Sequence, residues 1–556
     1  MIDKVVGLSK LSLTAVPKYW DTQAKFTYDL STSQKLSLNF IYGDSRIDIE
    51  GDPKSKDEQR KKMLDSSSVQ TLYPVTKQYA AGLGLQSLFG KDGYSNLTLY
   101  SSGVSSDIDI REDFVVRQRD ANGDVRNYSI LNSRNVFSNH STESFISAKY
   151  ELYYQLSEQN ALSAGLQFQT TLKWKNDVFL SADSSRYDLD HNGTYETGPV
   201  IVPAGYYYQS LAFGEASLYY AYASDKYMIT PQLSLTLGGR YDHFTYAGKG
   251  SLTPRASLSY QLVPSISTLT LAVGEYSQTN PFPYYGDRRN IGYNRSLDYM
   301  QATHYVLGFE HILDRGLKLS VESYYKKYRD IAVGEDFIYS QIDTFWSDKM
   351  LAIGDRYSYG IDFYLEQKQV EDYFGQLSIS LSKTMDKDPR IPPLTDWYSS
   401  DYDYPFIVTA IAGKVVKSFR DWIDDEPFYI KYPLYIFPFS NEMEISFKYR
   451  FQTGRAYTPV DYVTWKQERE GGVHWSKGAW VSTNDINSER YPNYSRLDLQ
   501  WLSRFYMKSY NINVYVALMN VLNTKNVFYI DYRSDGTKET VYQFAFFPVV
   551  GVEFEY

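Results

Sequence analysis

Apolar and polar residues alternate with a period of two from Leu233 to Val273. Leucines occupy every second position of Leu233–Leu237, and the spacing returns over Ala256–Leu262 and Leu269–Val273. This period predicts strands with one apolar and one polar face. Strands of soluble sandwiches usually have about six residues, whereas about 9 to 11 tilted residues cross a bilayer. The long regular runs therefore predict an all-β fold, a transmembrane antiparallel β-barrel.

The same pattern predicts about 19 strands along the chain. They are Trp20–Leu30, Gln34–Arg46, Val75–Phe89, Tyr94–Phe114, Glu143–Leu156, Ala161–Leu180, Gln209–Ala223, Met228–Phe244, Thr253–Leu262, Thr268–Ser277, Gln301–Leu313, Leu317–Val333, Arg356–Lys368, Gly375–Lys383, Phe406–Val416, Glu442–Gln452, Ser495–Tyr506, Tyr510–Leu522 and Tyr542–Tyr556.

The predicted connections alternate in length. Gly90–Gly93 and Ser224–Tyr227 are short, whereas Val115–Thr142 and Thr453–Tyr494 are long. Outer-membrane barrels have short periplasmic turns and long extracellular loops. Lys417–Asn441 is long although it falls on the short side, and we interpret it as a periplasmic insertion.

Strand parity bears on how much of the barrel is present. Bacterial single-chain barrels have an even number of strands. If the last strand ends in the periplasm, an odd number of strands precedes the first predicted one, and three more would give about 22, the size of plugged transporters. The start MIDKVVGLSK lacks the apolar region of a signal peptide. We therefore expect residues 1–556 to be one barrel domain, truncated at its N-terminus, whose natural start lies upstream of Met1.

Composition agrees with a barrel and excludes several other classes. The chain has 55 Tyr among 556 residues, and rings with polar tips favour the membrane–water boundary. A Tyr-rich carbohydrate-binding β-protein is the alternative. No apolar run is long enough for a transmembrane helix, and a mean hydropathy of -0.44 is compatible with strands whose polar face offsets the apolar one. The net charge of -9 argues against nucleic acid, and without Cys there are no disulfides.

The C-terminal residues alternate up to a final aromatic. Val552, Phe554 and Tyr556 are separated by Glu553 and Glu555. The pattern resembles the signal by which the barrel-assembly machinery recognises its clients, and the alternative is an ordinary last strand. We interpret these three apolar residues as an assembly signal.

A set of stretches, in the family's order, resembles the TonB-dependent receptors, which are active transporters of the Gram-negative outer membrane. They are Val16–Ser31 with Gln34–Asp44, Leu237–Phe244, Thr253–Leu262, Thr303–His311, Leu319–Ile331, Tyr357–Lys368, Phe451–Pro459, Tyr491–Trp501, Val516–Phe528 and Phe546–Tyr556.

The resemblance implies energised import by an integral outer-membrane protein. Family members carry an N-terminal plug that fills the lumen and binds TonB, and nothing in this chain resembles that plug. We therefore expect contact with the TonB complex only through a plug outside this sequence. Outer-membrane lipid is the expected surrounding, and a surface lipoprotein stays open as a further partner.

One stretch has the spacing of a metal loop. Asp188, Asp190 and Asn192 alternate before Gly193, with Glu196 nearby, like the first half of a calcium loop. The acid expected at the twelfth position is missing, since Pro199 stands there. The alternative is an Asx–Gly turn in an extracellular loop, so calcium is the only cofactor to consider and no metal site is assigned firmly.

Catalytic motifs are not found. The six His residues have no zinc spacing, and no nucleophile motif of the GxSxG type occurs. We therefore predict no catalytic residues, no enzyme activity and no cofactor-binding residues.

Aromatic residues of the predicted outer loops are candidates for substrate capture. They can stack on a sugar, haem or aromatic chelate, and the alternative is that they belong to the aromatic belt or pack within the loops. The candidates are Trp346, Trp397, Tyr398, Tyr402 and Tyr404.

Two other functions stay open beside that of a TonB-dependent importer of a metal chelate, haem or glycan. A passive outer-membrane porin would leave the lumen open. A surface carbohydrate-binding β-protein would leave the membrane without detergent. The sequence does not identify the cargo.

Overall fold

The computed structural model describes most of the chain. The described residues are 18–48, 66–119, 125–180, 183–185, 200–202, 205–286, 292, 294–314, 316–334, 349–370, 372–389, 396–417, 426–430, 440–468, 474–482, 485–532 and 536–556.

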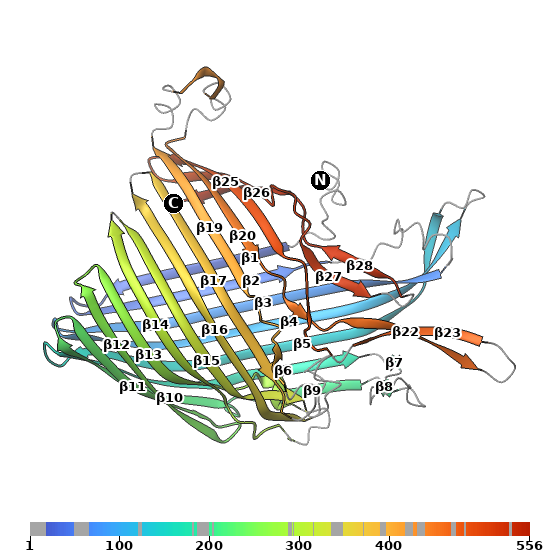
Figure 1. Cartoon of the computed structure of the whole chain (residues 1–556), viewed down its shortest axis with the longest axis horizontal. Coiled ribbons are helices and arrows are strands. Elements are labelled where there is room, and N and C mark those ends of the chain that lie inside the picture. The colour runs from blue at the N-terminus through green and yellow to red at the C-terminus, as the bar shows by residue number, and fades with distance from the viewer. Residues whose placement is uncertain are drawn as a thin grey trace.

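One large antiparallel sheet accounts for most of these residues, and its strands pair in chain order. Its members are β1 (Lys18–Asp29), β2 (Gln34–Arg46), β3 (Ser66–Phe89), β4 (Gly93–Arg119), β5 (Val125–Gln155), β6 (Asn160–Leu180), β9 (Gly205–Leu211), β10 (Ser217–Thr230), β11 (Leu233–Phe244), β12 (Lys249–Val263), β13 (Ser267–Gln278), β14 (Met300–Asp314), β15 (Leu317–Gly334), β16 (Met350–Val370), β17 (Tyr373–Lys387), β18 (Tyr398–Ser399), β19 (Phe406–Lys417), β20 (Glu442–Gln452), β25 (Tyr494–Tyr506), β26 (Asn511–Met519) and β29 (Phe547–Glu555). In Figure 1 they follow one another around a strongly curved sheet, from blue β1 to red β26.

The predicted strand number is confirmed. The sheet has 21 strands, but β9 and β10 both pair with β6 and together form one neighbour of it. β18 has only two residues. Leaving out β18 and counting β9 with β10 gives the 19 predicted strands. Among the described strands, no pairing joins β1 to β29, so the described sheet is open there.

The two faces of the sheet differ as the period of two predicts. Leu258, Leu271 and Leu307 lie side by side on consecutive strands, and Leu271 is 57% exposed. Large apolar side chains that stay uncovered on one face across many strands are not the core of a globular protein. We call this the apolar face.

The opposite, polar face carries ion pairs between residues two apart on one strand, which point the same way. Lys149 lies 2.7 Å from Glu151, Arg240 2.6 Å from Asp242, and Arg496 2.6 Å from Asp498. These three ion pairs lie on the face away from the exposed leucines, which the period of two predicts to be polar.

Several predicted connections are wrong. Ser224–Tyr227 lies inside β10, which pairs continuously with β6, and the turn falls at Pro231–Gln232 instead. Most of Val115–Thr142 is strand, because β4 and β5 continue pairing up to Arg119 and Val125. The alternation of short and long connections also has an exception, because the short turn 245–248 joins β11 and β12 on the side where long loops are expected.

Other predicted loops contain short strands of their own. Thr453–Tyr494 holds the pairs β21 (Ala456–Tyr457) with β24 (Glu489–Arg490) and β22 (Val460–Glu468) with β23 (His474–Ser482). The remaining pairs are β7 (Asp183–Ser185) with β8 (Val200–Val202) and β27 (Val527–Tyr532) with β28 (Lys538–Tyr542).

The buried core is small and lies at the loop ends of the strands. The short helix α3 (Phe282–Tyr285) follows β13, and its Phe282 ring lies 5.4 Å from Trp174 and 6.0 Å from Phe244. Tyr285 is buried against the same Phe244 ring. Aromatic packing thus holds the β13–β14 connection against the strands. In the described part of the chain, no helix has the length and apolarity of a membrane span.

Candidate functional site

The segment 396–405, between β17 and β19, is fixed by hydrogen bonds to the end of β17. The Thr384 amide donates to Asp403 Oδ1 over 2.8 Å, and Ser382 Oγ donates to the Tyr404 carbonyl over 3.1 Å. The Ser400 amide donates back to the Thr384 carbonyl. The side chains of this segment are therefore held in a defined place.

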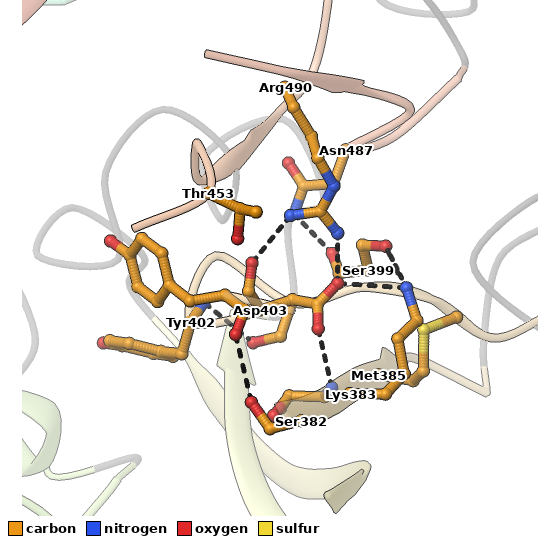
Figure 2. Close-up of polar contacts among 12 residues, drawn as sticks. Ser382, Lys383, Met385, Ser399, Tyr402, Asp403, Thr453, Asn487 and Arg490 are labelled. Atoms are coloured by element: carbon orange, nitrogen blue, oxygen red, sulfur yellow. Dashed lines mark hydrogen bonds and ion pairs between the residues drawn. The ribbon is translucent and has the colours of Figure 1, made fainter. Parts of the chain in front are cut away.

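Asp403 is the centre of this arrangement (Figure 2). Its side chain is fully buried, and both of its oxygens have partners. Lys383 Nζ lies 3.0 Å from Oδ2, and the Arg490 guanidinium donates to the same oxygen. A buried carboxylate must be paired and hydrogen-bonded to be tolerated. Two cations and one amide meet that condition here.

Arg490 and Asn487 bring a second loop to this segment. Arg490 Nη1 donates to the Asp403 carbonyl over 2.7 Å and to the Gly454 carbonyl over 3.1 Å. Asn487 Nδ2 donates to the Ser399 carbonyl over 2.7 Å. We call Lys383, Asp403, Asn487 and Arg490 the loop clamp, because they join the β17–β19 connection to the β20–β25 connection.

The predicted capture residues separate between the two faces. Trp397 packs edge-on against Tyr357 at 4.6 Å, and Tyr357 shares the apolar face with exposed Tyr359 and Ile361. With Tyr325 and Tyr305 these rings form a ladder along the strand ends. This position favours the aromatic-belt interpretation of Trp397.

Tyr398 and Tyr402 lie on the polar face instead. Tyr398 pairs with Asp386, which forms an ion pair with Arg356. The Tyr402 ring is 69% exposed and lies 5.2 Å from the Arg356 guanidinium. Burial, and next the charge of Asp386, raise the pKa of Tyr398, so its hydroxyl stays protonated at neutral pH. Trp346 lies outside the described residues.

Tyr404 lines a recess of about 350 Å³ at the loop ends of β20 and β25. Gly454 and Tyr491 also line it, and Gly454 allows the two ends of the β20–β25 connection to approach closely, since a Cβ there would overlap the carbonyl of Tyr491. The other lining residues are Arg450, Gln452, Thr453, Arg455, Pro492, Tyr494, Val527, Phe528 and Gln543.

The family described as "TonB dependent receptor-like, beta-barrel" matches residues 19–523. The chain belongs to this family. Members are transporters of the bacterial outer membrane, which agrees with the two-faced sheet. The sequence matches none of the curated proteins with which it was compared.

Solved structures support the same fold. The outer membrane transporter YddB from Escherichia coli has a TM-score of 0.56 at 12% identity, covering 97% of this chain and 69% of its own. The pyoverdine receptor FpvA from Pseudomonas aeruginosa PAO1 has a TM-score of 0.57 at 12% identity, and the match covers 98% of this chain and 71% of the receptor. The ferric-catecholate import receptor Fiu from Escherichia coli K12 has a TM-score of 0.56 at 10% identity, and the match covers 97% of this chain and 74% of the receptor. For another FpvA structure the chain spans 65% of the length, so it corresponds to about two thirds of such a receptor.

The calcium prediction stays untested in this receptor barrel. Asp188, Asp190, Asn192 and Glu196 all lie outside the described residues. Within the described ranges, no three His, Asp or Glu side chains are grouped to hold a metal ion.

The C-terminal residues lie on the apolar face. Val552 pairs with Val514, and Phe554 pairs with Ile512. The side chains of Val552 and Phe554 are exposed. Tyr556 is 98% exposed and lies 6.3 Å from the Tyr510 ring. Their role in assembly stays a prediction.

The loop clamp and the arginines of the recess were not among the predicted residues. Asp403 and Arg490 are 87 positions apart, and neither belongs to a motif. The sequence signals in this region were the predicted aromatic residues of the segment 396–405 and the family-like stretches Phe451–Pro459 and Tyr491–Trp501.

Proposed function

We propose that this chain is the barrel of a TonB-dependent importer in a Gram-negative outer membrane. The cargo is a nutrient too bulky or too scarce for porins, such as a metal chelate, haem or a glycan. In the complete protein, cargo binding outside would expose the TonB-binding segment of a plug, and TonB would move that plug aside. No covalent chemistry is required of this chain.

The single observation that carries the proposal is the two-faced sheet in a chain of this family. Leu258, Leu271 and Leu307 stay exposed across three strands, a surface that lipid would cover. The ion pairs of the opposite face would line a wet lumen. The similarity to receptors for pyoverdine and ferric catecholates favours a chelate as cargo.

Cargo capture would fall to the loop ends on the polar face. Tyr402 and Tyr404 are held there by the loop clamp, and Tyr398 stays protonated beside them. Rigid rings beside an Arg–Asp pair suit the stacking and orientation of a flat ligand. We assign Tyr398, Tyr402 and Tyr404 to this role, and we give the C-terminal strand the role of contacting the barrel-assembly machinery.

Energy dependence tests the proposal. The complete protein would be expressed in a Gram-negative host, and accumulation of labelled ferric pyoverdine, ferric catecholate, haem and oligosaccharides would be measured with and without TonB. We expect at least one cargo to accumulate only when TonB is present. Accumulation that is independent of TonB, together with steady conductance in planar bilayers, would show a passive porin and refute the proposal.

A further inference from the structure

The recess beside Tyr404 carries positive charge that no carboxylate of the described residues neutralises. Its lining includes Arg450 and Arg455 but no Asp or Glu. The chain as a whole has a net charge of -9. A lining with two cations and no acid therefore differs from the average surface of this protein.

Arg450 lies directly opposite Arg496 across β20 and β25. Like charges at opposite positions of neighbouring strands destabilise a sheet. Asp498 neutralises Arg496 at 2.6 Å, whereas Arg450 Nη2 donates to the neutral amide oxygen of Gln452 over 2.9 Å. No ion pair joins Arg450 to a carboxylate of the described ranges. Arg450 thus lacks the acidic partner that offsets the charge of Arg496, and an anion in the recess would supply one.

Arg455 is exposed, and its guanidinium lies 4.9 Å from the centre of the Tyr491 ring. It too forms no ion pair with a carboxylate in the described part of the chain. By contrast, Arg240, Arg356 and Arg504 of the polar face each have an acidic partner. Stacking on Tyr491 fixes the plane of the guanidinium and leaves its N–H groups available.

The aromatic walls add a second requirement. Tyr404, Tyr491 and Phe528 line the same recess, and Phe528 is largely exposed. Aromatic faces stack on flat or ring-shaped groups. A volume of about 350 Å³ is near the lower end for ligand sites, so the recess suits one ring with its substituent.

We infer that this recess binds an oxyanion, such as a carboxylate, carried on a ring of the imported nutrient. Arg450 and Arg455 bind the anionic oxygens, and the aromatic walls hold the ring. The inference rests on the proposed function, because the ring is taken to be part of the cargo. The ring can come from an acidic sugar or from an aromatic acid, which share this chemistry.

Equilibrium binding to the complete protein in detergent micelles tests the inference with matched probes. The acids are a galacturonate disaccharide and salicylate, and their neutral counterparts are the methyl ester of the disaccharide and salicylamide. Isothermal titration is run on the wild type and on Arg450→Gln, Arg455→Gln and Arg295→Gln. Arg295 is the matched control, because it is exposed and lies 5.0 Å from the Tyr246 ring, outside the recess.

We expect at least one acid to bind about 10-fold or more tightly than its neutral counterpart, since hydrogen bonds to charged groups contribute that much. Arg450→Gln and Arg455→Gln each remove most of this preference, and Arg295→Gln keeps it. Which acid binds identifies the source of the ring. Equal binding of acid and neutral probe, an equal loss in Arg295→Gln, or no binding of either acid to folded protein would overturn the inference.

The two proposals fail separately. One result is that acid binding requires both arginines but no cargo accumulates in a TonB-dependent way. That result refutes import and leaves the recess assignment standing. TonB-dependent accumulation of a neutral cargo, without any preference for acids, refutes only the recess assignment.

Discussion

Replacing Asp403 by Asn is expected to loosen the segment 396–405 without unfolding the sheet. The substitution keeps the shape of the side chain but removes the charge that Lys383 and Arg490 share. Breaking a buried ion pair costs about 3 to 5 kcal/mol. We expect the lower end, about 3 kcal/mol, because the Lys383 and Arg490 side chains are 33% and 31% exposed and water can reach them.

Hydrogen–deuterium exchange measures this effect locally. A loss of about 3 kcal/mol corresponds to about a 100-fold rise in the population of open segment, and the amide exchange rates rise with it. The amide of Thr384 is the most direct reporter, since it donates to Asp403. Amides in the middle of β13 serve as the internal reference and are expected not to change.

Asp401→Asn is the matched control for this experiment. Asp401 is exposed and accepts one hydrogen bond, from Asn487 at 2.9 Å. Exposed polar contacts contribute about 0 to 1 kcal/mol, so exchange should change by about 5-fold at most. If Asp403→Asn leaves exchange at Thr384 within the range of the Asp401→Asn variant, the loop clamp does not hold this segment and our reasoning is refuted.

Three further variants address the faces, the recess and the C-terminus. Leu258→Arg is expected to cost about 2 to 4 kcal/mol of barrel stability in a bilayer, and the neighbouring Ser257→Arg on the polar face less than about 1 kcal/mol; urea unfolding in lipid vesicles compares the two. Gly454→Ala would push a Cβ into the backbone of Tyr491 and is expected to weaken binding of the preferred acid about 10-fold; unchanged affinity contradicts the assigned contact. Deleting Tyr556 is expected to lower severalfold the fraction of the protein in outer membranes that is folded, measured by heat-modifiable migration on gels. If refolding in detergent is unchanged, the defect lies in assembly and not in stability.

Local sequence carried most of the information about the sheet. A strand that contacts lipid on one face and water on the other must alternate, so Leu269–Val273 and Ala256–Leu262 were found directly. The errors arose where alternation stops being informative. Val115–Thr142 lacks a regular alternation, yet β4 and β5 pair through most of it, and the ion pair of Arg134 with Glu112 joins the two strands.

The turn between β10 and β11 was misplaced for a related reason. Ser224–Tyr227 is a short polar run and looks like a turn, but its residues pair with β6 and β11 on both sides. Pro231 and Gln232 form the turn, and they were assigned to a strand because apolar residues flank them.

The candidate site was predictable only in part. Aromatic residues in loops are visible in a sequence, and Tyr402 and Tyr404 were predicted as candidates in that way. The loop clamp depends on Asp403 meeting Arg490 from a distant segment, and only the paired strands bring them together. The charge of the recess likewise depends on which arginines have acidic neighbours in space, such as Arg496 beside Asp498 and Arg450 beside none among the described residues.

The most direct test of the two-faced barrel uses the absence of natural Cys. Single Cys variants along Thr268–Val273 of β13 would be spin-labelled in lipid vesicles, and their collisions with lipid-soluble oxygen and with a water-soluble nickel chelate would be measured. We predict that Leu269, Leu271 and Val273 favour oxygen and that Thr268, Thr270 and Ala272 favour the chelate. The same accessibility at all six positions would contradict a membrane-spanning strand with one lipid face and one wet face.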